Sequence, residues 1–295
     1  MINPFTEKND TNSTDIALVE SAQKGDREAL EKLILRHQTW IYNIALRMVL
    51  NPHDAEDVTQ EILIKIITKL STFEGKSSFR TWLYRIVANH VINMKKGHCE
   101  MKVTNFKDYG QELDRTPDME LPDKSRSPVD IQVLAEEAKI GCMTGMLLCL
   151  DREQRLVYIL GEIFNISDSI GSEILQIRRE NFRQKLSRAR RDLHSFMNEK
   201  CGLINQNNPC RCVKKTASWI HDGLVEPDNL KFNRNYLKKV KDISEGKSKQ
   251  LENFLDDEYA SIFRNHPFQT LPDFVKSLQG ILNNKQFQQI INFTG

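Results

Sequence analysis

The chain has 295 residues, a length that fits two or three compact domains rather than one small helical unit. Hydrophobic residues make up 39% of the chain, which is enough to fill such cores, and 28% of the residues are charged, with a formal net charge of only +2. This balance excludes a uniformly basic or acidic protein, so the charge pattern has to be followed segment by segment.

No stretch of the sequence predicts a secretory signal or a membrane span. Residues 1–15 are polar and acidic, without an apolar core after a basic start. The longest nearly apolar run, residues 141–150, has about half of the residues that a membrane helix needs. We therefore expect a cytoplasmic protein without membrane insertion, whose six cysteines are reduced.

Apolar residues recur at helical spacing through most of the chain, which predicts an all-α protein. The first helical domain covers residues 15–97, and turn or cap residues interrupt it at Gly25, before Pro52 and within residues 71–78. Its nearly continuous apolar stripe consists of Leu30, Leu33, Ile34, His37, Ile41, Ile44, Ala45 and Met48.

The rest of the chain divides into four further segments. Residues 98–128 contain three prolines among polar residues and sustain no apolar period, which predicts a flexible linker. Helical periodicity returns over residues 129–198, which predicts a second helical domain. A cysteine-bearing joint, residues 199–215, and a helical C-terminal extension, residues 216–295, follow.

The second domain contains the pattern of a helix-turn-helix, a short helix and a longer one joined by a tight connection at residues 175–177. The inner faces consist of Ile170, Ile174 and Ile177, then Phe182, Leu186, Ala189, Leu193 and Phe196. Residues 178–191 hold seven Lys or Arg and one Glu, a net charge of +6. The outer face of the longer helix carries Arg183, Gln184, Ser187, Arg188 and Arg191.

These outer side chains suit a helix that reads the major groove of DNA. Arg can bind guanine through two hydrogen bonds, Gln can do the same with adenine, and the flanking cations neutralise phosphates. A solvated basic face on an ordinary helical hairpin is the alternative. The short preceding helix and the tight turn favour DNA recognition.

A second feature combines aromatic and basic residues between Phe73 and Lys96, and residues 76–96 contain no acid. The cations are Lys76, Arg80, Arg85, Lys95 and Lys96, and the aromatic residues are Phe73, Phe79, Trp82 and Tyr84. Aromatic faces stack on unpaired bases while cations hold the backbone, as in proteins that bind single-stranded nucleic acid. The alternative is that Phe79, Trp82 and Ile86 pack in the core, and we expect some of each.

Residues 52–61 form a third feature, an acidic segment with a net charge of −4 and no Lys or Arg. Asp54 and Glu56 alone would be explained by the preference for acids in a first helical turn. Because the acidic face continues through Asp57, Gln60 and Glu61, and DNA would be repelled by it, we expect a protein partner here.

Three strings resemble those of extracytoplasmic-function sigma factors, in the order of that family. Residues 54–61, DAEDVTQE, resemble its polymerase-binding signature. Residues 79–83, FRTWL, with the following Ile86 and Asn89, resemble its promoter-melting and −10-reading helix. Residues 186–190, LSRAR, resemble the end of its −35-reading helix.

The resemblance implies a non-enzymatic subunit that directs core RNA polymerase to promoter DNA, needs no cofactor, and has an anti-sigma factor as a possible partner. Core polymerase would contact Asp54, Asp57, Gln60 and Glu61. The −10 element and the melted strand would contact Phe73, Lys76, Arg80, Trp82, Arg85, Asn89 and Lys95. The −35 element would contact Arg178, Arg179, Asn181, Arg183, Gln184, Ser187 and Arg188. The chain departs from the usual family pattern at Asn93, Gln176, Arg178 and Glu180, which bears on promoter sequence and not on class.

Three late cysteines and an upstream histidine, namely Cys201, Cys210, Cys212 and His194, have the number and chemistry of a tetrahedral zinc site. Their spacing is not that of a common zinc finger. A redox pair and plain structural thiols therefore remain open as alternatives.

Two other functions compete with the sigma-factor interpretation. A stand-alone repressor or activator would bind duplex DNA through the helix-turn-helix alone and would not need the acidic segment. A thiol oxidoreductase using Cys210 and Cys212 would need a positioned base, and the sequence offers neither one nor a phosphate-binding loop.

The C-terminal extension exceeds what promoter reading requires. Its apolar stripe consists of Leu251, Phe254, Leu255, Tyr259, Ile262 and Phe263. Such a stripe has to be buried, and we expect it either to dock on the preceding domains and regulate them or to form a small packing module.

Overall fold

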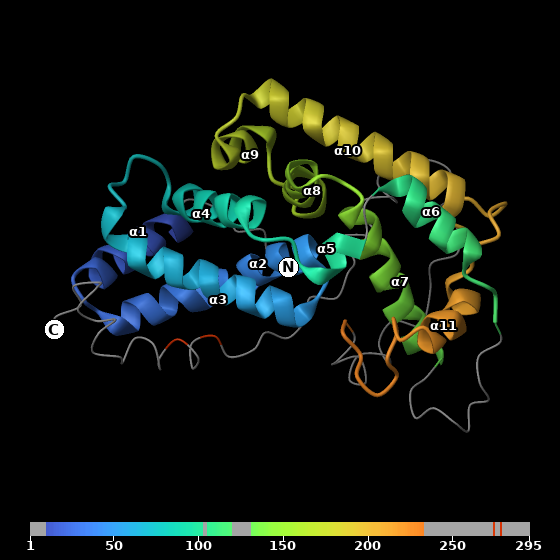
Figure 1. Ribbon diagram of the computed structural model, residues 1–295. Coiled ribbons are helices and arrows are strands. Elements are labelled where there is room, and N and C mark those ends of the chain that lie inside the picture. Colours follow the sequence, from blue (N-terminus) through green and yellow to red (C-terminus); the bar gives the residue numbers. More distant parts are fainter. Residues whose placement is uncertain (1–9, 103–104, 120–130, 233–273, 275–277, 279–295) are drawn as a thin grey trace.

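The computed structural model describes residues 10–102, 105–119 and 131–232, together with Phe274 and Leu278 (Figure 1). Over these residues it is built from helices, and the strand-type pairing is one isolated bridge, so the all-α prediction is confirmed. The elements are α1 (Asp10–Gln23), α2 (Arg27–Val49), α3 (Pro52–Lys69), η1 (Leu70–Thr72), α4 (Phe79–Asn93), α5 (His98–Lys102), α6 (Phe106–Arg115), α7 (Ile131–Leu148), α8 (Arg152–Tyr158), the π-helical η3 (Ile159–Ile163), α9 (Asp168–Leu175), α10 (Arg179–Lys200) and α11 (Cys212–His221).

The first helical unit consists of α1 to α4, and its helices α2, α3 and α4 begin at the predicted breaks. The Asp26 carboxylate accepts hydrogen bonds from the first backbone N–H groups of α2, and the Asn51 side chain does the same for α3, which starts with Pro52. The predicted apolar stripe of α2 is buried along its whole length. The packing of α2 on α3, α1 and α4 forms the core of this first unit.

The second unit, α7 to α10, contains the predicted helix-turn-helix in α9 and α10. Gln176 ends α9 with a φ of 55°, a left-handed conformation that reverses the chain within the tight turn. Gly171 lets α9 approach α10, because a Cβ atom there would lie 2.4 Å from the Phe182 ring. Ile174 and Phe182 are buried between the two helices.

The prediction of a flexible linker over residues 98–128 is partly wrong, because the first part of this segment forms the packed helices α5 and α6. Asn105 caps α6 by accepting a hydrogen bond from Asp108 N at 2.9 Å. Tyr109 and Leu113 lie on the apolar side of α6, and the Tyr109 ring lies 5.9 Å from that of Phe196 in α10. Helices of one to three turns were too short for the sequence pattern to reveal. Residues 120–128 lie outside the described part.

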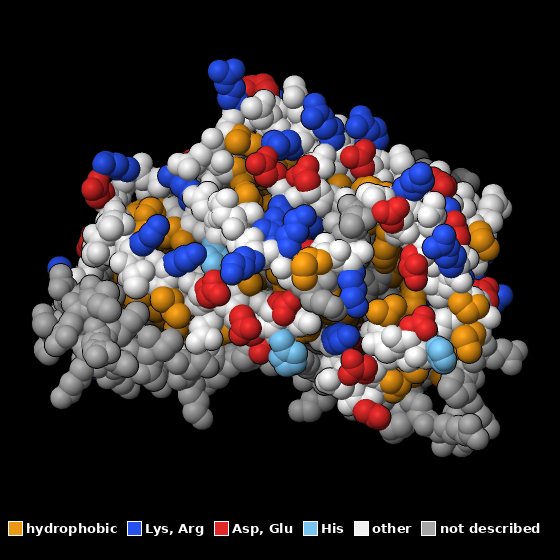
Figure 2. All heavy atoms as spheres, viewed as in Figure 1, with side chains coloured by type: hydrophobic (Ala, Val, Ile, Leu, Met, Phe, Trp, Pro, Cys, Tyr) orange, Lys and Arg blue, Asp and Glu red, His pale blue; other side chains and the backbone are white. Residues whose placement is uncertain are grey.

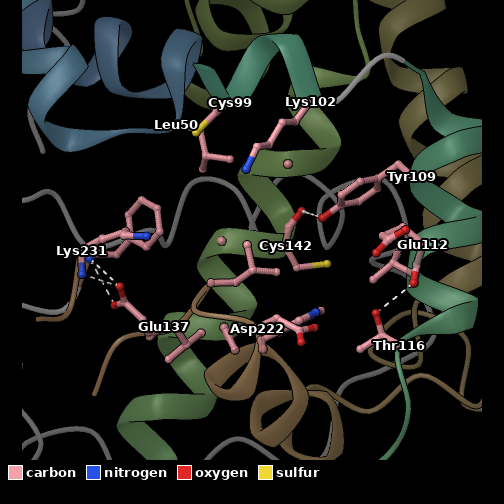
Figure 3. A pocket seen from close by; sticks show the side chains of 18 of the residues that line it. Leu50, Cys99, Lys102, Tyr109, Glu112, Thr116, Glu137, Cys142, Asp222 and Lys231 are labelled. Carbon is pink, nitrogen blue, oxygen red and sulfur yellow. Dashed lines mark hydrogen bonds between the residues drawn. The ribbon is translucent and has the colours of Figure 1, made fainter. Parts of the chain in front are cut away.

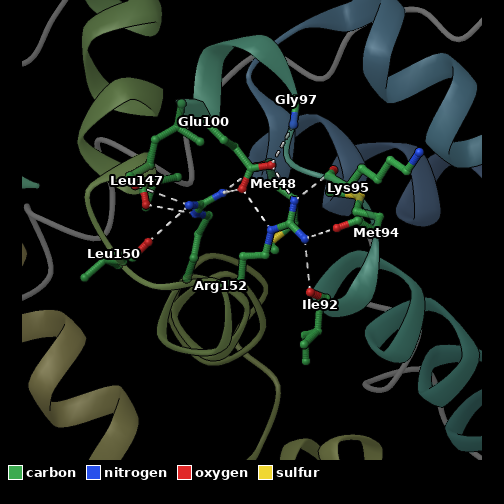
Figure 4. A network of polar contacts seen from close by, with 11 residues as sticks. Met48, Ile92, Met94, Lys95, Gly97, Glu100, Leu147, Leu150 and Arg152 are labelled. Carbon is green, nitrogen blue, oxygen red and sulfur yellow. Dashed lines mark hydrogen bonds and ion pairs between the residues drawn. The ribbon is translucent and has the colours of Figure 1, made fainter. Parts of the chain in front are cut away.

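A buried ion-pair network joins the two units (Figure 4). The carboxylate of Glu100 in α5 accepts hydrogen bonds from Arg152 at 2.7 and 3.0 Å and from Arg155 at 2.9 Å, both in α8. Burial would raise the pKa of Glu100, but the two guanidinium groups lower it. Arg152 also donates to the carbonyl oxygens of Ile92, Met94 and Lys95, and Arg155 to those of Met48, Leu147, Leu148 and Leu150.

The chain after α10 folds back on the second unit. Helix α11 packs against α7, and the buried carboxylate of Glu137 in α7 accepts hydrogen bonds from the backbone N–H groups of Lys231 and Phe232. Phe274 and Leu278 are buried as well, and the Phe274 ring lies 6.2 Å from that of Tyr42 in α2. The apolar stripe expected between residues 251 and 263 lies outside the described residues. No helix among the described residues is long and apolar enough to cross a membrane.

Candidate functional site

The outer face of α10 presents the side chains that we expected to read DNA. In Figure 2, Lys and Arg side chains lie along the upper edge, over α9 and α10, with acidic side chains among them. The seven expected residues are all exposed, namely Arg178, Arg179, Asn181, Arg183, Gln184, Ser187 and Arg188. The structure therefore places them on one accessible helix, as reading a groove would require.

Two of these cations already have an acidic partner. Asp168, the first residue of α9, binds Arg179 at 2.7 Å and also pairs with Arg183. The hydrogen bond from Arg179, with that from Arg183, lowers the pKa of Asp168 to about 2, so its carboxylate stays ionised at neutral pH. Sequence inspection missed Asp168 because it is an ordinary acid in a first helical turn.

The aromatic residues before and within α4 form a cluster. Phe79 is buried, and the half-buried Phe73 and Trp82 contact its ring at centroid distances of 5.5 and 5.7 Å. Lys76 is exposed in the loop before α4 and pairs with Glu74. Core packing thus accounts for Phe79, and Phe73 and Trp82 keep part of their surface in solvent.

Arg80 lies inside the fold, although we expected it to contact DNA. It is buried and donates a hydrogen bond of 2.9 Å to Asp15, whose side chain is fully buried. Burial would raise the pKa of Asp15, but hydrogen bonds from His37 and Arg80 lower it overall. Since Arg80 holds α4 to α1, we correct its assignment from a DNA-binding to a structural residue.

The remaining expected DNA contacts of α4 lie on its outer side. Asn89 and Lys95 are exposed. Arg85 is half-buried because its guanidinium group donates hydrogen bonds of 3.3 and 3.1 Å to the carbonyl oxygen of Glu173 in α9. In this arrangement α9 therefore covers part of α4.

The acidic side of α3 is accessible. Asp57 and Glu61 are exposed, and Asp54 and Gln60 are half-buried. The Glu61 carboxylate lies 3.4 Å from Nε2 of His90 in α4, and Nδ1 of the same ring lies 2.6 Å from Nζ of Lys65. Burial and Lys65 lower the pKa of His90, while Glu61 opposes this shift. Figure 2 shows acidic side chains together over α3.

Comparison with protein families matches residues 33–98 to the family described as sigma-70 region 2. These residues contain both the acidic side of α3 and the aromatic and basic residues of α4. Residues 33–98 are a sigma-70 region 2 domain. The match supports the resemblance to sigma factors over these residues, whereas α10 lies outside it.

Curated relatives are similar over somewhat more than a quarter of the chain. The chain is 42% identical over 83 residues to the RNA polymerase sigma-H factor of Pseudomonas aeruginosa, which covers 28% of this chain and 43% of the relative. It is 44% identical over 80 residues to the ECF RNA polymerase sigma-E factor of Escherichia coli, covering 27% and 41%. The matches thus span less than half the length of these relatives.

Two solved structures are similar over larger parts of the chain. One is CnrH in complex with the cytosolic domain of CnrY, with a TM-score of 0.43 and 22% identity over 63% of this chain and 97% of that one. The other is RpoE in complex with the anti-sigma factor NepR from Bartonella quintana, with a TM-score of 0.35 and 20% identity over 57% and 95%.

The cysteine joint follows directly on α10. Cys201 comes immediately after the helix, Cys210 pairs with it through the isolated bridge, and Cys212 begins α11. His194 lies seven residues before Cys201 in α10, a rise of about 10 Å along the axis. Among the described residues, no three His, Cys, Asp or Glu side chains are arranged to hold a metal ion, and the expected set with His194 is not brought together.

Proposed function

We propose that the protein is an RNA polymerase sigma factor that binds core RNA polymerase, recognises promoter −35 and −10 elements and promotes DNA melting, without enzymatic activity of its own. The observation that carries the proposal is the combination in one chain of a region 2 domain with a helix-turn-helix whose expected DNA-reading residues are all exposed. A stand-alone DNA-binding regulator would not require the region 2 domain.

Each surface has a role that its chemistry supports. The acidic side of α3, with Asp57 and Glu61 exposed, is proposed to bind core polymerase through a basic or polar surface. The loop before α4, with Phe73 and Lys76, and the outer side of α4, with Asn89 and Lys95, are proposed to hold the melted −10 strand. The outer face of α10 is proposed to read the −35 element.

The domain boundaries follow from these roles. We propose region 2 over residues 15–97 and the −35-reading region over residues 129–198. α5 and α6 connect them as packed helices. A protein with these partners would act in the cytoplasm, and an anti-sigma factor belongs among the partners to be tested.

The contact between α4 and α9 bears on how these surfaces work together. Arg85 is occupied by Glu173, so α4 can offer this cation to DNA only after α9 has moved away. We infer that the described arrangement is a closed form and that binding to polymerase and promoter separates the two units.

Run-off transcription with purified core polymerase tests the proposal. A sigma factor is expected to produce a discrete transcript from its promoter only when both chain and core are present. A stand-alone regulator would bind the same DNA without core. If the chain and core together yielded no transcript, that result would contradict the proposal.

Strand opening can be followed in the same complexes by permanganate footprinting. Replacing Phe73, Lys76 and Asn89 by Ala is expected to reduce opening, because loss of one base-stacking partner costs about 1 to 3 kcal/mol. A matched variant with Ala at the exposed Thr68, Lys69 and Ser71 is expected to open the promoter normally. Undiminished opening in the first variant would remove this segment from the melting surface.

A further inference from the structure

Helix α11 contains a buried cation, Lys215, whose side chain is directed at the chain that follows α6. Its ammonium group donates a hydrogen bond to the carbonyl oxygen of Thr116, and its Nζ lies 3.1 Å from Oδ1 of Asp118. Both partners belong to residues 116–119, which leave α6 on the way from the first unit to the second. A buried ammonium group is stable only with such partners, so α11 and residues 116–119 depend on each other.

Two further hydrogen bonds fasten the same four residues to α11. The buried hydroxyl of Ser218 donates a hydrogen bond of 2.6 Å to the carbonyl oxygen of Pro117. The backbone N–H of Met119 donates one of 3.2 Å to the carbonyl oxygen of Lys214. We call the contacts of Lys214, Lys215 and Ser218 with residues 116–119 the clasp.

Helix α11 is itself fixed to the second unit. It packs along α7, and its Trp219 is buried. The chain after α11 returns to the same helix, because the Glu137 carboxylate of α7 accepts hydrogen bonds of 2.6 and 2.9 Å from the N–H groups of Lys231 and Phe232. Whatever the clasp holds therefore stays with the second unit.

Helix α6 has little else to hold it. Only Gly110 and Leu113 among its ten residues are buried, and its aromatic residues contact Phe196 in α10. A cavity of about 470 Å³ lies between α6, α7 and α11, and the Tyr109 hydroxyl reaches across to donate a hydrogen bond of 2.9 Å to the carbonyl oxygen of Cys142 (Figure 3). A helix of this length is marginal by itself in water, so we expect its position to depend on the clasp at its C-terminal end.

The clasp thereby decides how much chain is free to connect the two units when they separate. With α6 in place, the connection between α4 and α6 consists of residues 94–105, and a chain of this length spans at most roughly 40 Å. Without α6, the connection would extend over residues 94–130, and a chain of that length can span roughly 130 Å. The shorter connection restricts how far apart α4 and α10 can bind.

We propose that Lys215 and Ser218 are positioning residues, which hold α6 on the second unit and so restrict the spacing between the −35 and −10 elements that the protein accepts. The inference rests on the proposed function, because it requires that the two units read separate elements. Each added base pair moves the elements apart by about 3.4 Å and rotates them by about 35° around the DNA axis. A short connection accommodates few such changes.

Hydrogen exchange of the full chain tests the clasp independently of transcription. In the variant Lys215→Met with Ser218→Ala, the amides of α6 should exchange at least about tenfold faster than in the wild type, because a hydrogen bond to a charged group is lost. The amides of α8 and α10 should keep their protection. Lys214→Met is the matched control, since its exposed side chain is outside the clasp and its carbonyl oxygen keeps its hydrogen bond.

Run-off transcription from promoters that differ only in the number of base pairs between the two elements tests the consequence. When the spacer departs from its best length by about two base pairs, roughly 7 Å, the wild type and Lys214→Met should lose most of their yield. The double variant should lose a smaller fraction of its own best yield. A variant that had merely lost stability would instead lose yield by the same factor at every spacer.

The two measurements separate the possible failures. Unchanged exchange of α6 in the double variant would overturn the clasp, and faster exchange with an unchanged spacer profile would overturn its role in promoter spacing. No transcript from the wild type at any spacer would contradict the proposed function, and with it the role in spacing, while the exchange measurement would still decide whether the clasp holds α6. If circular dichroism shows that the double variant is unfolded, Ser218→Ala alone replaces it in both measurements.

Discussion

The guanidinium group of Arg85 in α4 donates two hydrogen bonds, of 3.3 and 3.1 Å, to the carbonyl oxygen of Glu173 in α9. The contact joins the helix proposed to hold the −10 strand to the first helix of the helix-turn-helix. Because the acceptor is a backbone carbonyl, changing the Glu173 side chain would leave these hydrogen bonds in place and remove only the longer ion pair of its carboxylate with Arg85, at 3.9 Å. The Glu100 network is the better point at which to loosen the two units.

Replacing Glu100 by Gln is expected to destabilise the chain by about 3 to 5 kcal/mol, because Arg152 and Arg155 would lose the carboxylate between them. Urea unfolding measures the change. Glu153→Gln is the matched control, since this acid forms an exposed pair with Lys185 and should cost no more than about 1 kcal/mol. Equal stability of the two variants would mean that the network does not hold the units together.

Replacing Asp168 by Asn is expected to strengthen DNA binding by α10, because Arg179 and Arg183 lose their acidic partner and become available to phosphates. The slope of log affinity against log salt concentration should steepen by about 1 for each added phosphate contact. Binding titrations at several salt concentrations measure this slope. Asp192→Asn removes the same charge from α10 beside Arg191 and should change the slope less. An unchanged slope for Asp168→Asn would show that Asp168 does not compete with DNA.

Reversing Asp57 and Glu61 to Lys is expected to weaken association with core polymerase, because both side chains are exposed on the acidic side of α3. Co-purification with core measures association, and circular dichroism checks that the helices persist. The double variant with Lys at Glu20 and Glu28 carries the same charge change on exposed positions of α1 and α2. If both variants bind core as the wild type does, α3 is not the docking surface.

His90 should make stability depend on mildly acidic pH. Its pKa in the folded chain lies below the ordinary 6.5, because burial and Lys65 disfavour its charged form. The unfolded chain therefore binds the proton more readily. The contribution of His90 to the stability of the fold is therefore present above about pH 6.5, and it is lost as the pH falls through the window below that value.

His90→Gln should flatten the dependence of the urea midpoint on pH in this window. His53→Gln is the control, because His53 is exposed at the start of α3 and should leave the dependence intact. A His90→Gln variant with an unchanged slope would assign the pH dependence to other groups.

Much of the fold could be predicted because its signals are local. The starts of α2 and α3 follow from Asp26, Asn51 and Pro52, and the apolar stripe of α2 follows from helical periodicity. α5 and α6 were missed because helices of one to three turns carry little periodicity. α6 owes its position to contacts made by Tyr109 with α7 and α10, which lie far along the chain.

The exposure of the expected site residues could be predicted where it follows from helical phase, as on the outer face of α10, and their contact with DNA stays a prediction. The prediction was wrong for Arg80, which looks like any other cation of the basic segment. Its partner Asp15 lies 65 positions away in the sequence, and the partners Arg152 and Glu100 are 52 apart. Such pairs leave no periodic signal in one sequence.

The C-terminal extension gives the last prediction. Phe274 and Leu278 are buried, and Phe274 contacts Tyr42 of α2, the helix that packs on α3, the helix proposed to bind polymerase. We expect removal of residues 233–295 to change transcript yield from a fixed promoter while thermal stability stays nearly constant. Cutting after Phe232 preserves the hydrogen bonds that Glu137 receives from Lys231 and Phe232.

The full-length variant Phe274→Ala with Leu278→Ala should reproduce the effect of the truncation, because it removes the docked side chains and keeps the rest of the chain. Run-off yield at equal, saturating core concentration and a melting curve for each variant are the two measurements. A packing module without a regulatory role would instead lower the melting temperature in both variants. Unchanged yield from a truncated chain that remains fully folded would rule out regulation by the extension.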